Sequence, residues 1–288
     1  MLVTLQEVLE EAIKGNYAVG AFNSPTLESA RAVVEAAEEL NVPVILSHAE
    51  VHDEIVPIEV IGPILIDLAK KATVPVVVHL DHGSSLETVK KAIGLGFSSV
   101  MIDASHLEYD DNVKVVKEVV KYAHAQNVSV EAELGTITSS GLGGEESLGN
   151  DSHEIIEIYT NPEIAQDFVQ QTGIDALAAS FGTVHGIYMT EPNLDFKRLQ
   201  QISDRIQLPV VMHGGSGLSE HEYRTAINAG VRKINYYSYA AKAGAQAILD
   251  KVNQESKSMV FFYHDFTVIA KNSMKRNVKG AMQLFMNK

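Results

Sequence analysis

The feature that most constrains the fold is a regular alternation between short apolar runs rich in β-branched residues and longer segments with helical periodicity. Several runs are almost continuously apolar, as in strands that are buried on both faces. The predicted strands are Tyr17–Phe22, Pro43–Ser47, Val74–Leu80, Ser98–Ile102, Val128–Leu134, Ala176–Ser180, Pro209–His213 and Arg232–Tyr236. Eight such units in a chain of 288 residues predict an α/β protein with a closed (β/α)8 TIM barrel.

An amphipathic helix is expected ahead of the first strand. Thr4 and Glu7 fit a capping box, apolar residues follow at helical spacing, and Gly15 stands where a C-cap is expected. The main alternative is an open doubly wound sheet, but no G-x-G-x-x-G motif follows any predicted strand. No linker or low-complexity run divides the chain. We therefore expect residues 1–288 to form one barrel domain with a leading helix.

Composition excludes several classes of function. Lysine and arginine number 23 against 37 aspartates and glutamates, and the net charge of −14 makes nucleic acid an unsuitable partner. The chain has no cysteine, so any transition metal must bind His, Asp or Glu. The N-terminal segment lacks a signal-peptide pattern, and no apolar run approaches the ~20 residues of a membrane span. A cytoplasmic protein without a membrane partner is expected.

Polar residues follow or end most of the predicted strands, where a barrel brings them to one mouth. They are Asp81, His82, Asp103, Glu131, Glu133, His185, His213 and Asn235. Three of them, His82, His185 and His213, predict a zinc site, because catalytic zinc commonly takes three protein ligands. His79 and His106 lie near the mouth and could orient ligands. The other histidines, including His48 and His52, are interpreted as structural or solvated.

A glycine-rich segment follows the seventh predicted strand. His213-Gly214-Gly215-Ser216-Gly217 precedes a helical segment that begins near Leu218. Glycines let the backbone approach a ligand, and a helix N-terminus favours an anion, so this segment predicts a phosphate site. The irregular stretch from about Gly135 to Thr160 is long enough to predict a lid or binding loop.

These motifs resemble those of the class II, zinc-dependent ketose-bisphosphate aldolases. The resemblance spans nearly the whole chain and is carried, in order, by YAVGAFN, PVVVHLDHG, SSVMIDASH, VSVEAELG, GGEE, YTNPEIAQDFVQQTGIDALAASFGTVHG, VVMHGGSGL and AGVRKIN. It implies cleavage of a ketose phosphate, fructose or tagatose 1,6-bisphosphate above all, into dihydroxyacetone phosphate and an aldehyde such as glyceraldehyde 3-phosphate. It also implies a homodimer or homotetramer.

The resemblance assigns roles to particular residues. It implies that His82, His185 and His213 bind Zn²⁺, that Asp81 is the acid and base at the aldehyde oxygen, and that Glu146 moves a proton of the ketose donor. Asn23 and Asn235 would orient the donor, Asn235 as part of the catalytic set, and Asp103 and Glu133 match a second position beside the metal. The implied substrate contacts are Asn23, Gly186, Gly214, Gly215, Ser216, Asn235, Tyr236, Tyr237 and Ser238. A Na⁺ or K⁺ ion near the phosphate is also implied.

Departures from the family pattern leave the substrate open. Tyr236, Tyr237 and Tyr239 replace smaller or acidic residues after the last strand, and Lys275 and Arg276 are candidates for binding a distal phosphate. An unusual ketose 1-phosphate is therefore an alternative substrate. Two other hypotheses are a Schiff-base aldolase, for which Lys233 is the only strand lysine, and a barrel that binds phosphosugars without catalysis.

Overall fold

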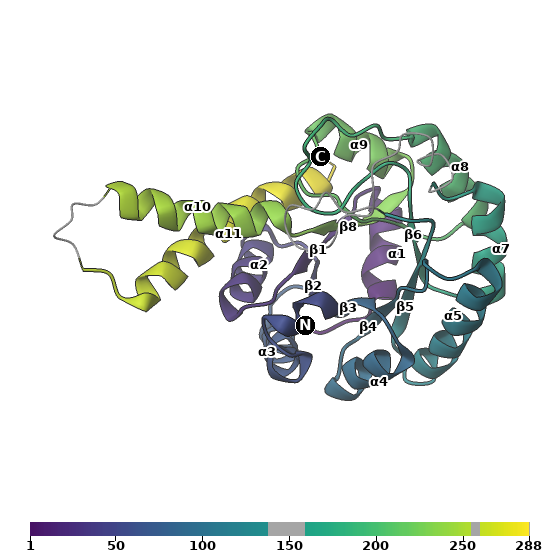
Figure 1. Ribbon diagram of the computed structural model, residues 1–288, viewed down its shortest axis with the longest axis horizontal. Helices are drawn as coiled ribbons and strands as arrows, with labels where there is room; N and C mark the ends of the chain where they lie inside the picture. The colour runs from purple at the N-terminus through teal and green to yellow at the C-terminus, as the bar shows by residue number, and fades with distance from the viewer. Residues whose placement is uncertain (138–158, 255–259, 288) are drawn as a thin grey trace.

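Eight parallel strands close into a barrel in chain order, as predicted (Figure 1). The computed structural model describes residues 1–137, 159–254 and 260–287. The strands are β1 (Val19–Asn23), β2 (Val44–Ala49), β3 (Val76–Gly83), β4 (Ser99–Ile102), β5 (Ser129–Leu134), β6 (Ala176–Ala179), β7 (Val210–Met212) and β8 (Val231–Tyr236). Each predicted strand corresponds to one of these, and the boundaries differ by up to three residues. β8 pairs with β1, so the sheet has no free edge.

Helices surround this barrel and connect its strands. They are α1 (Leu5–Gly15), α2 (Leu27–Leu40), α3 (Ile58–Lys71), α4 (Leu86–Leu95), α5 (Tyr109–His124), α7 (Pro162–Thr172), α8 (Phe196–Ile206), α9 (Glu220–Asn228), α10 (Ser238–Gln254) and α11 (Tyr263–Phe285), with the 3₁₀ helix η1 (Glu50–Glu54) after β2. α1 is the predicted leading helix and carries the predicted Thr4–Glu7 capping box. Its C-cap is Asn16 in the left-handed conformation rather than Gly15, because asparagine also tolerates positive φ.

The strands alternate between two cores. One core fills the barrel interior from below, where buried residues of α1 such as Leu5 and Leu9 meet Ile45, Val77 and Val211. The other lies between the strands and the surrounding helices. Because successive side chains of a strand point to opposite faces, every second residue faces the interior. Towards the upper ends of the strands those interior positions are polar, and this arrangement builds the site.

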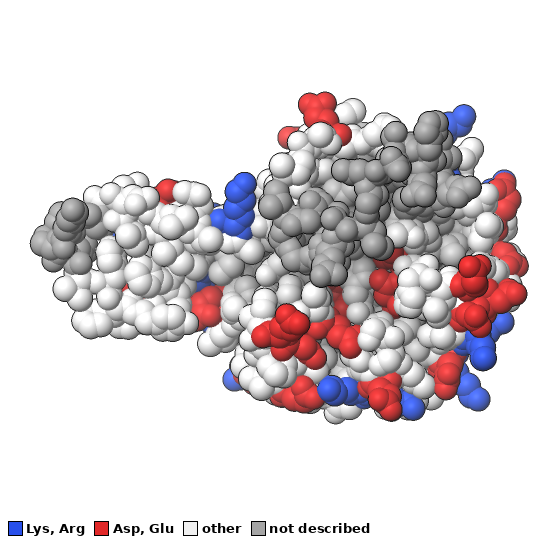
Figure 2. All heavy atoms as spheres, in the orientation of Figure 1, with Lys and Arg blue, Asp and Glu red and all other residues white. Residues whose placement is uncertain are grey.

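A pair of helices extends to one side of the barrel. α11 packs against both α10 and α2, and the outer ends of α10 and α11 project away from the barrel (Figure 1). Figure 2 shows few charged side chains on the outer part of this pair, whereas Asp and Glu side chains gather over parts of the barrel. Within the described residues, no helix has the length and apolar character needed to span a membrane.

Candidate active site

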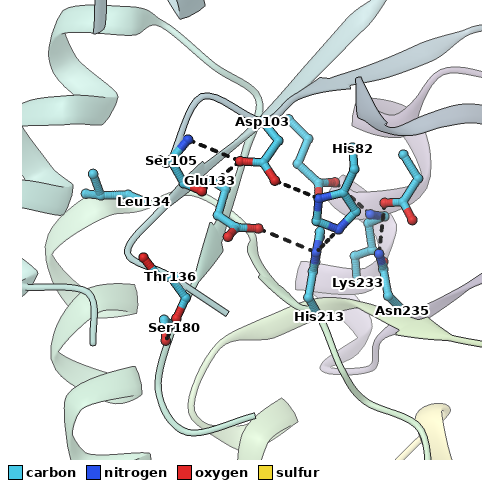
Figure 3. Close-up of polar contacts among 12 residues, drawn as sticks. His82, Asp103, Ser105, Glu133, Leu134, Thr136, Ser180, His213, Lys233 and Asn235 are labelled. Carbon is cyan, nitrogen blue, oxygen red and sulfur yellow. Dashed lines mark hydrogen bonds and ion pairs between the residues drawn. The ribbon is translucent and has the colours of Figure 1, made fainter. Parts of the chain in front are cut away.

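Asp81 is held at the centre of the mouth by two asparagines from other strands. Asn23 at the end of β1 donates its amide Nδ2 to Asp81 Oδ2 at 3.1 Å. Asn235 in β8 donates to Asp81 Oδ1 at 3.0 Å, a contact that Figure 3 marks with a dashed line at Asn235. Burial alone would raise the pKa of Asp81, but the nearby His82 and Lys233 lower it well below its usual range. The carboxylate is therefore ionised and fixed in orientation.

His82 reaches the same mouth through an irregularity in β3. In a regular strand, successive side chains point to opposite faces, so the residue after Asp81 would point towards the helices. His82 instead has a left-handed backbone conformation with φ of 48°, and the pairing of β3 with β4 shifts register between Leu80 and Gly83. Such a conformation costs of the order of 1–3 kcal/mol in a residue other than glycine and is concentrated at functional sites. The irregularity places two consecutive side chains, Asp81 and His82, at one site.

The three predicted histidines come together. Candidate ligand atoms of His82, His185 and His213 all lie within 4.8 Å of one another. His82 Nε2 and His213 Nδ1 are 2.9 Å apart. The opposite nitrogen of each ring contacts a carboxylate, with Asp103 Oδ2 2.8 Å from His82 Nδ1 and Glu131 Oε1 2.8 Å from His213 Nε2. Carboxylates hold metal-binding histidines in this way, leaving the inner nitrogens to face the metal.

The charges of the site also fit a cation. Burial would lower the pKa of His82, but Asp81, Asp103 and Glu133 raise it to about 10, so an imidazolium balances this acidic cluster. Burial lowers the pKa of His185 to about 3, helped by repulsion from His82. One ring is thus held charged and another neutral around a common point. A divalent cation there would replace the proton of His82 and accept all three rings as neutral ligands.

Asp103 and Glu133 form the expected second group with His82. Candidate ligand atoms of these three residues also lie within 4.8 Å of one another. Burial and repulsion from Asp103 raise the pKa of Glu133 well above its usual value. Its Oε2 atom is buried and has no hydrogen-bond partner among the residues that the structure describes, although it lies 3.6 Å from His213 Nδ1. These oxygen and nitrogen donors could hold a cation when the protein is loaded with metal.

A fully buried ion pair lies on the barrel-interior side of the histidines. Lys233 Nζ is 2.8 Å from Glu131 Oε2, and both side chains are inaccessible to solvent. His79, expected to orient ligands, contacts Ser99 Oγ at 2.8 Å, and its Nε2 lies 3.7 Å from Glu131 Oε2. His79 is therefore connected to the site through Glu131. His106, the other histidine expected in that role, is exposed.

The spacing of polar residues within single strands also indicates this buried network. Three strands each carry two polar residues at positions i and i+2. The pairs are His79 and Asp81 in β3, Glu131 and Glu133 in β5, and Lys233 and Asn235 in β8. The member of each pair nearer the strand end points into the mouth, so the other must lie one layer deeper in the interior. Lys233, the only lysine in a predicted strand, is the deeper member of its pair and forms the buried ion pair with Glu131.

The glycine-rich segment after β7 lies against the end of β8. Gly214 has φ of 63°, and a Cβ atom there would come within 2.3 Å of the Val184 carbonyl oxygen. Gly215 N donates to Asn235 O at 3.1 Å, and Tyr237 N donates to Ser216 Oγ at 2.9 Å. These contacts join the two loops that barrels commonly use for phosphate.

Two further predicted substrate residues lie close to these loops. Gly186 follows His185 and has φ of 96°. Ser238 is the first residue of α10, whose N-terminus therefore begins directly after β8. A helix N-terminus presents backbone N–H groups that favour an anion. The expected phosphate site thus lies within one region of the mouth.

The predicted substrate residue Tyr236 directs its side chain away from this mouth. It packs edge-on against Phe22 and Phe285, in the core between strands and helices, and its hydroxyl group donates to Asn277 Oδ1 at 3.0 Å. Only its main chain is available to a ligand at the strand end. The neighbouring residue Asn235 points into the barrel, and the next side chain along a strand points to the opposite face.

Some predictions fall elsewhere in the chain. Glu146, the expected donor-side base, lies outside the described residues, as does most of the loop from Gly135 to Thr160. Lys275, a candidate for a distal phosphate, lies on α11 and pairs with Glu39 of α2 at 2.9 Å. It is thus engaged in the contact between two outer helices.

Two histidines that were interpreted as structural or solvated are buried near the end of β2. His48 ends near the top of β2 and is fully buried, with Nε2 2.7 Å from Asp53 Oδ1. His52 lies in η1, is only 8% exposed, and stacks at a tilt on Tyr237 with ring centroids 4.8 Å apart. Neither is solvated. Sequence spacing gave no indication of this, because the contact of His52 depends on the short helix that follows β2.

The fold and the site define a (β/α)8 barrel whose strand ends carry three histidines able to hold a metal ion. The chain matches the profile of the family described as fructose-bisphosphate aldolase class-II over residues 3–288. It therefore belongs to the class II fructose-bisphosphate aldolase family, a family of aldehyde-lyases, which confirms the resemblance drawn from the sequence.

Individual relatives agree with this assignment. The chain is 40% identical over 292 residues to a protein named fructose-bisphosphate aldolase from Staphylococcus aureus, covering 99% of this chain and 97% of that one. A protein of the same name from Geobacillus stearothermophilus is 39% identical over 289 residues, covering 99% and 96%. Among solved structures, the YdjI aldolase from Escherichia coli K12 matches with a TM-score of 0.86 and 31% identity, over 99% of this chain and 97% of that one.

Proposed function

We propose that the protein is a zinc-dependent aldolase that reversibly cleaves a ketose phosphate into dihydroxyacetone phosphate and an aldehyde. The expected substrates are fructose and tagatose 1,6-bisphosphate, with glyceraldehyde 3-phosphate as the aldehyde. The observation that carries the proposal is the convergence of three imidazoles beside an ionised Asp81. The names of the relatives from Staphylococcus aureus and Geobacillus stearothermophilus support the choice of sugar.

Zinc is the cofactor that best fits the three histidines. All donors are nitrogen or oxygen atoms, and the carboxylates of Asp103 and Glu131 contact the outer nitrogens of His82 and His213. When bound, zinc supplies a Lewis acid at the oxygen atoms of the donor ketose. Asp103 and Glu133 are proposed as a second position near the metal, and a Na⁺ or K⁺ ion as a further cofactor near the phosphate.

The chain's own residues move the protons. In cleavage, ionised Asp81 takes the hydroxyl proton of the carbon that becomes the aldehyde, and in condensation it returns that proton to the aldehyde oxygen. Asn23 and Asn235 fix the carboxylate. Their own Oδ1 atoms are buried and have no hydrogen-bond partner within the described part of the chain, so they are available to the substrate's hydroxyl groups. Glu146 is proposed to move the carbon-bound proton of the donor.

The phosphate of the donor is assigned to the joined loops after β7 and β8. Backbone N–H groups there, at positive-φ glycines and at the N-terminus of α10, provide local positive potential inside an acidic protein. The assigned contacts are Gly186, Gly214, Gly215, Ser216, Tyr237 and Ser238, with Tyr236 contributing through its main chain.

A second candidate substrate is a ketose 1-phosphate. A cavity opens between α2, α10 and α11, and Asn23 and Tyr237 are among the residues that line it. Its described lining includes no lysine or arginine, and Glu28 is the one charged residue among them. Lys275, a candidate partner of a distal phosphate, is paired with Glu39 instead. The Schiff-base alternative is less well supported, because Lys233 is fully buried against Glu131.

Donor proton exchange tests the proposed function without requiring the right aldehyde. Zinc-loaded protein is incubated with dihydroxyacetone phosphate in D₂O, and deuterium incorporation at carbon is followed by NMR. We expect exchange that a chelator abolishes and added zinc restores. Absence of exchange in the zinc-loaded protein would favour the barrel that binds phosphosugars without catalysis. Exchange that resists chelation but is trapped by borohydride would favour a Schiff-base enzyme instead.

We also expect a homodimer or homotetramer, with α10 and α11 in the interface. Leu249, Val252, Val260, Phe262 and Tyr263 are large apolar residues exposed on the outer part of this pair. Such a grouping is unusual on a monomer surface. Sedimentation analysis of the wild-type protein and of Phe262→Asp tests the expectation. A cytoplasmic location also remains a prediction.

A further inference from the structure

His52 and Tyr237 meet over the end of β1. β1 pairs with β2 on one side and with β8 on the other. His52 follows β2 and Tyr237 follows β8, and their ring centroids are 4.8 Å apart. Their contact must therefore bridge the strand between them, whose last residue is Asn23. Because Asn23 donates to Asp81, the two rings lie on the Asp81 side of the mouth.

Asp81 marks the side on which the aldehyde lies in the proposed reaction, opposite the phosphate of the donor. The two joined loops hold that phosphate at Gly214 to Ser216, and Tyr237 connects them through its N–H to Ser216 Oγ. The side chain of Tyr237 leaves the same backbone in the direction of His52. The aldehyde half of the substrate is thus bounded by His52 and Tyr237.

His52 has unused hydrogen-bonding capacity in this position. The residue is 8% exposed, and its Nδ1 atom is buried without a hydrogen-bond partner among the described residues. His48, its nearest histidine neighbour, is engaged with Asp53 instead. Asn23 Oδ1 is also buried, and no described residue forms a hydrogen bond with it. Buried polar atoms are rarely left unsatisfied, and an explanation for such a group is a polar ligand.

The chemistry of this group selects a hydroxyl rather than a phosphate. Burial and repulsion from His48 lower the pKa of His52 to about 4, so its imidazole is neutral at pH 7. A neutral imidazole has one donor and one acceptor nitrogen, as a sugar hydroxyl needs, and it offers no charge to an anion. Lys275, which could have supplied a charge, is paired with Glu39.

We propose that His52 is a specificity-determining residue that hydrogen-bonds a hydroxyl group of the aldehyde half of the substrate, against the ring of Tyr237. The inference rests on the proposed aldolase function and deepens it. It places hydroxylated aldehydes, rather than simple alkyl aldehydes, in the class that the enzyme accepts. The described ring contacts of His52 are with His48 and Tyr237, not with the three candidate metal-binding histidines, so the proposed role is one toward the aldehyde.

The test compares two aldehydes of three carbons, glyceraldehyde and propanal, which differ in their hydroxyl groups. Zinc-loaded wild type condenses each with dihydroxyacetone phosphate, and kcat/KM is measured for the aldehyde. His52→Phe keeps a ring against Tyr237 but removes both nitrogens. We expect this variant to lose about tenfold in kcat/KM for glyceraldehyde, the size of one neutral hydrogen bond, and to lose little for propanal.

Controls separate this role from a structural one. His52→Gln keeps hydrogen-bonding atoms and should retain part of the preference for glyceraldehyde. His221→Gln, on the exposed side of α9, should behave as wild type. Donor proton exchange should be unchanged in all three variants. Equal losses for the two aldehydes, or no loss for either, would overturn the role of His52. Absence of exchange in the wild type would instead overturn the aldolase function itself.

Discussion

His82 Nε2 and His213 Nδ1 face each other at 2.9 Å, although the two residues are 131 positions apart in the chain. Each ring is held from behind by a carboxylate, Asp103 for His82 and Glu131 for His213. If both inner nitrogens were unprotonated they would repel each other, and a cation between them removes that repulsion. The two outer contacts therefore orient both inner nitrogens as the proposed metal site requires.

Removal of one ring should abolish tight metal binding. We expect His213→Ala to retain less than one-tenth of the wild-type affinity for Zn²⁺, because it removes one of three ligands. Competition with a chromophoric chelator measures this affinity, and the visible spectrum of the Co²⁺ form reports coordination independently of activity. His106→Ala, at an exposed position, is the control. Wild-type affinity in His213→Ala would mean that the metal binds elsewhere.

Asp81 should be required for turnover but not for zinc binding. Asp81→Ala removes the proposed acid and base at the aldehyde oxygen and should lower kcat at least about a hundredfold. Zinc content should remain at the wild-type level, because Asp81 contacts Asn23 and Asn235 rather than a ligand nitrogen. Metal analysis and steady-state kinetics on the same sample decide the point. Normal activity in this variant would refute the assigned role.

Substitution of only one partner of the ion pair between Lys233 and Glu131 should destabilise the protein strongly. Both side chains are fully buried, so Lys233→Met leaves an uncompensated carboxylate in the barrel interior. We expect a loss of about 3–5 kcal/mol in the free energy of unfolding of the zinc-free protein. The double variant Lys233→Met with Glu131→Gln should recover part of that loss in urea unfolding. A single variant within about 1 kcal/mol of wild type contradicts this account.

His52 should make stability depend on pH in a defined window. Its pKa is lowered to about 4 in the folded protein, from an ordinary value near 6.5. Between these values the unfolded chain binds a proton that the folded protein does not, so stability falls as the pH is lowered from 6.5 towards 4. The slope from this one group is at most about 1.4 kcal/mol per pH unit.

His52→Gln should remove that contribution and leave the rest of the pH dependence in place. Urea unfolding at pH 7.5, 6 and 5 gives the stability difference between this variant and wild type. We expect the difference to shift in favour of the variant as the pH falls. A difference that stays constant would show that His52 titrates alike in folded and unfolded states.

The fold was predictable because each local pattern agreed with the barrel. Apolar runs such as Val76–Leu80 fit strands buried on both sides, and the capping box at Thr4 begins a helix that closes the barrel from below. The site followed from the same patterns, since strand ends converge whatever their order in the sequence. His82, His185 and His213 were therefore found without knowledge of any distance.

What was missed depends on details that patterns do not encode. The turn of His82 into the mouth requires a left-handed residue at an irregularity in β3. The side chain of Tyr236 faces the helices because the position beside it faces the interior. His52 meets Tyr237 only because η1 follows β2 directly. Each is a matter of one residue's orientation, which spacing along the chain leaves undetermined.

The most direct test is chelator-sensitive cleavage of three sugars. Fructose 1,6-bisphosphate, tagatose 1,6-bisphosphate and fructose 1-phosphate are each supplied to zinc-loaded and chelated protein, and release of dihydroxyacetone phosphate is measured with a coupled assay. We predict cleavage of at least one sugar by the zinc-loaded protein, loss of that cleavage with chelator and its recovery on adding zinc. Cleavage that proceeds equally without zinc would contradict it.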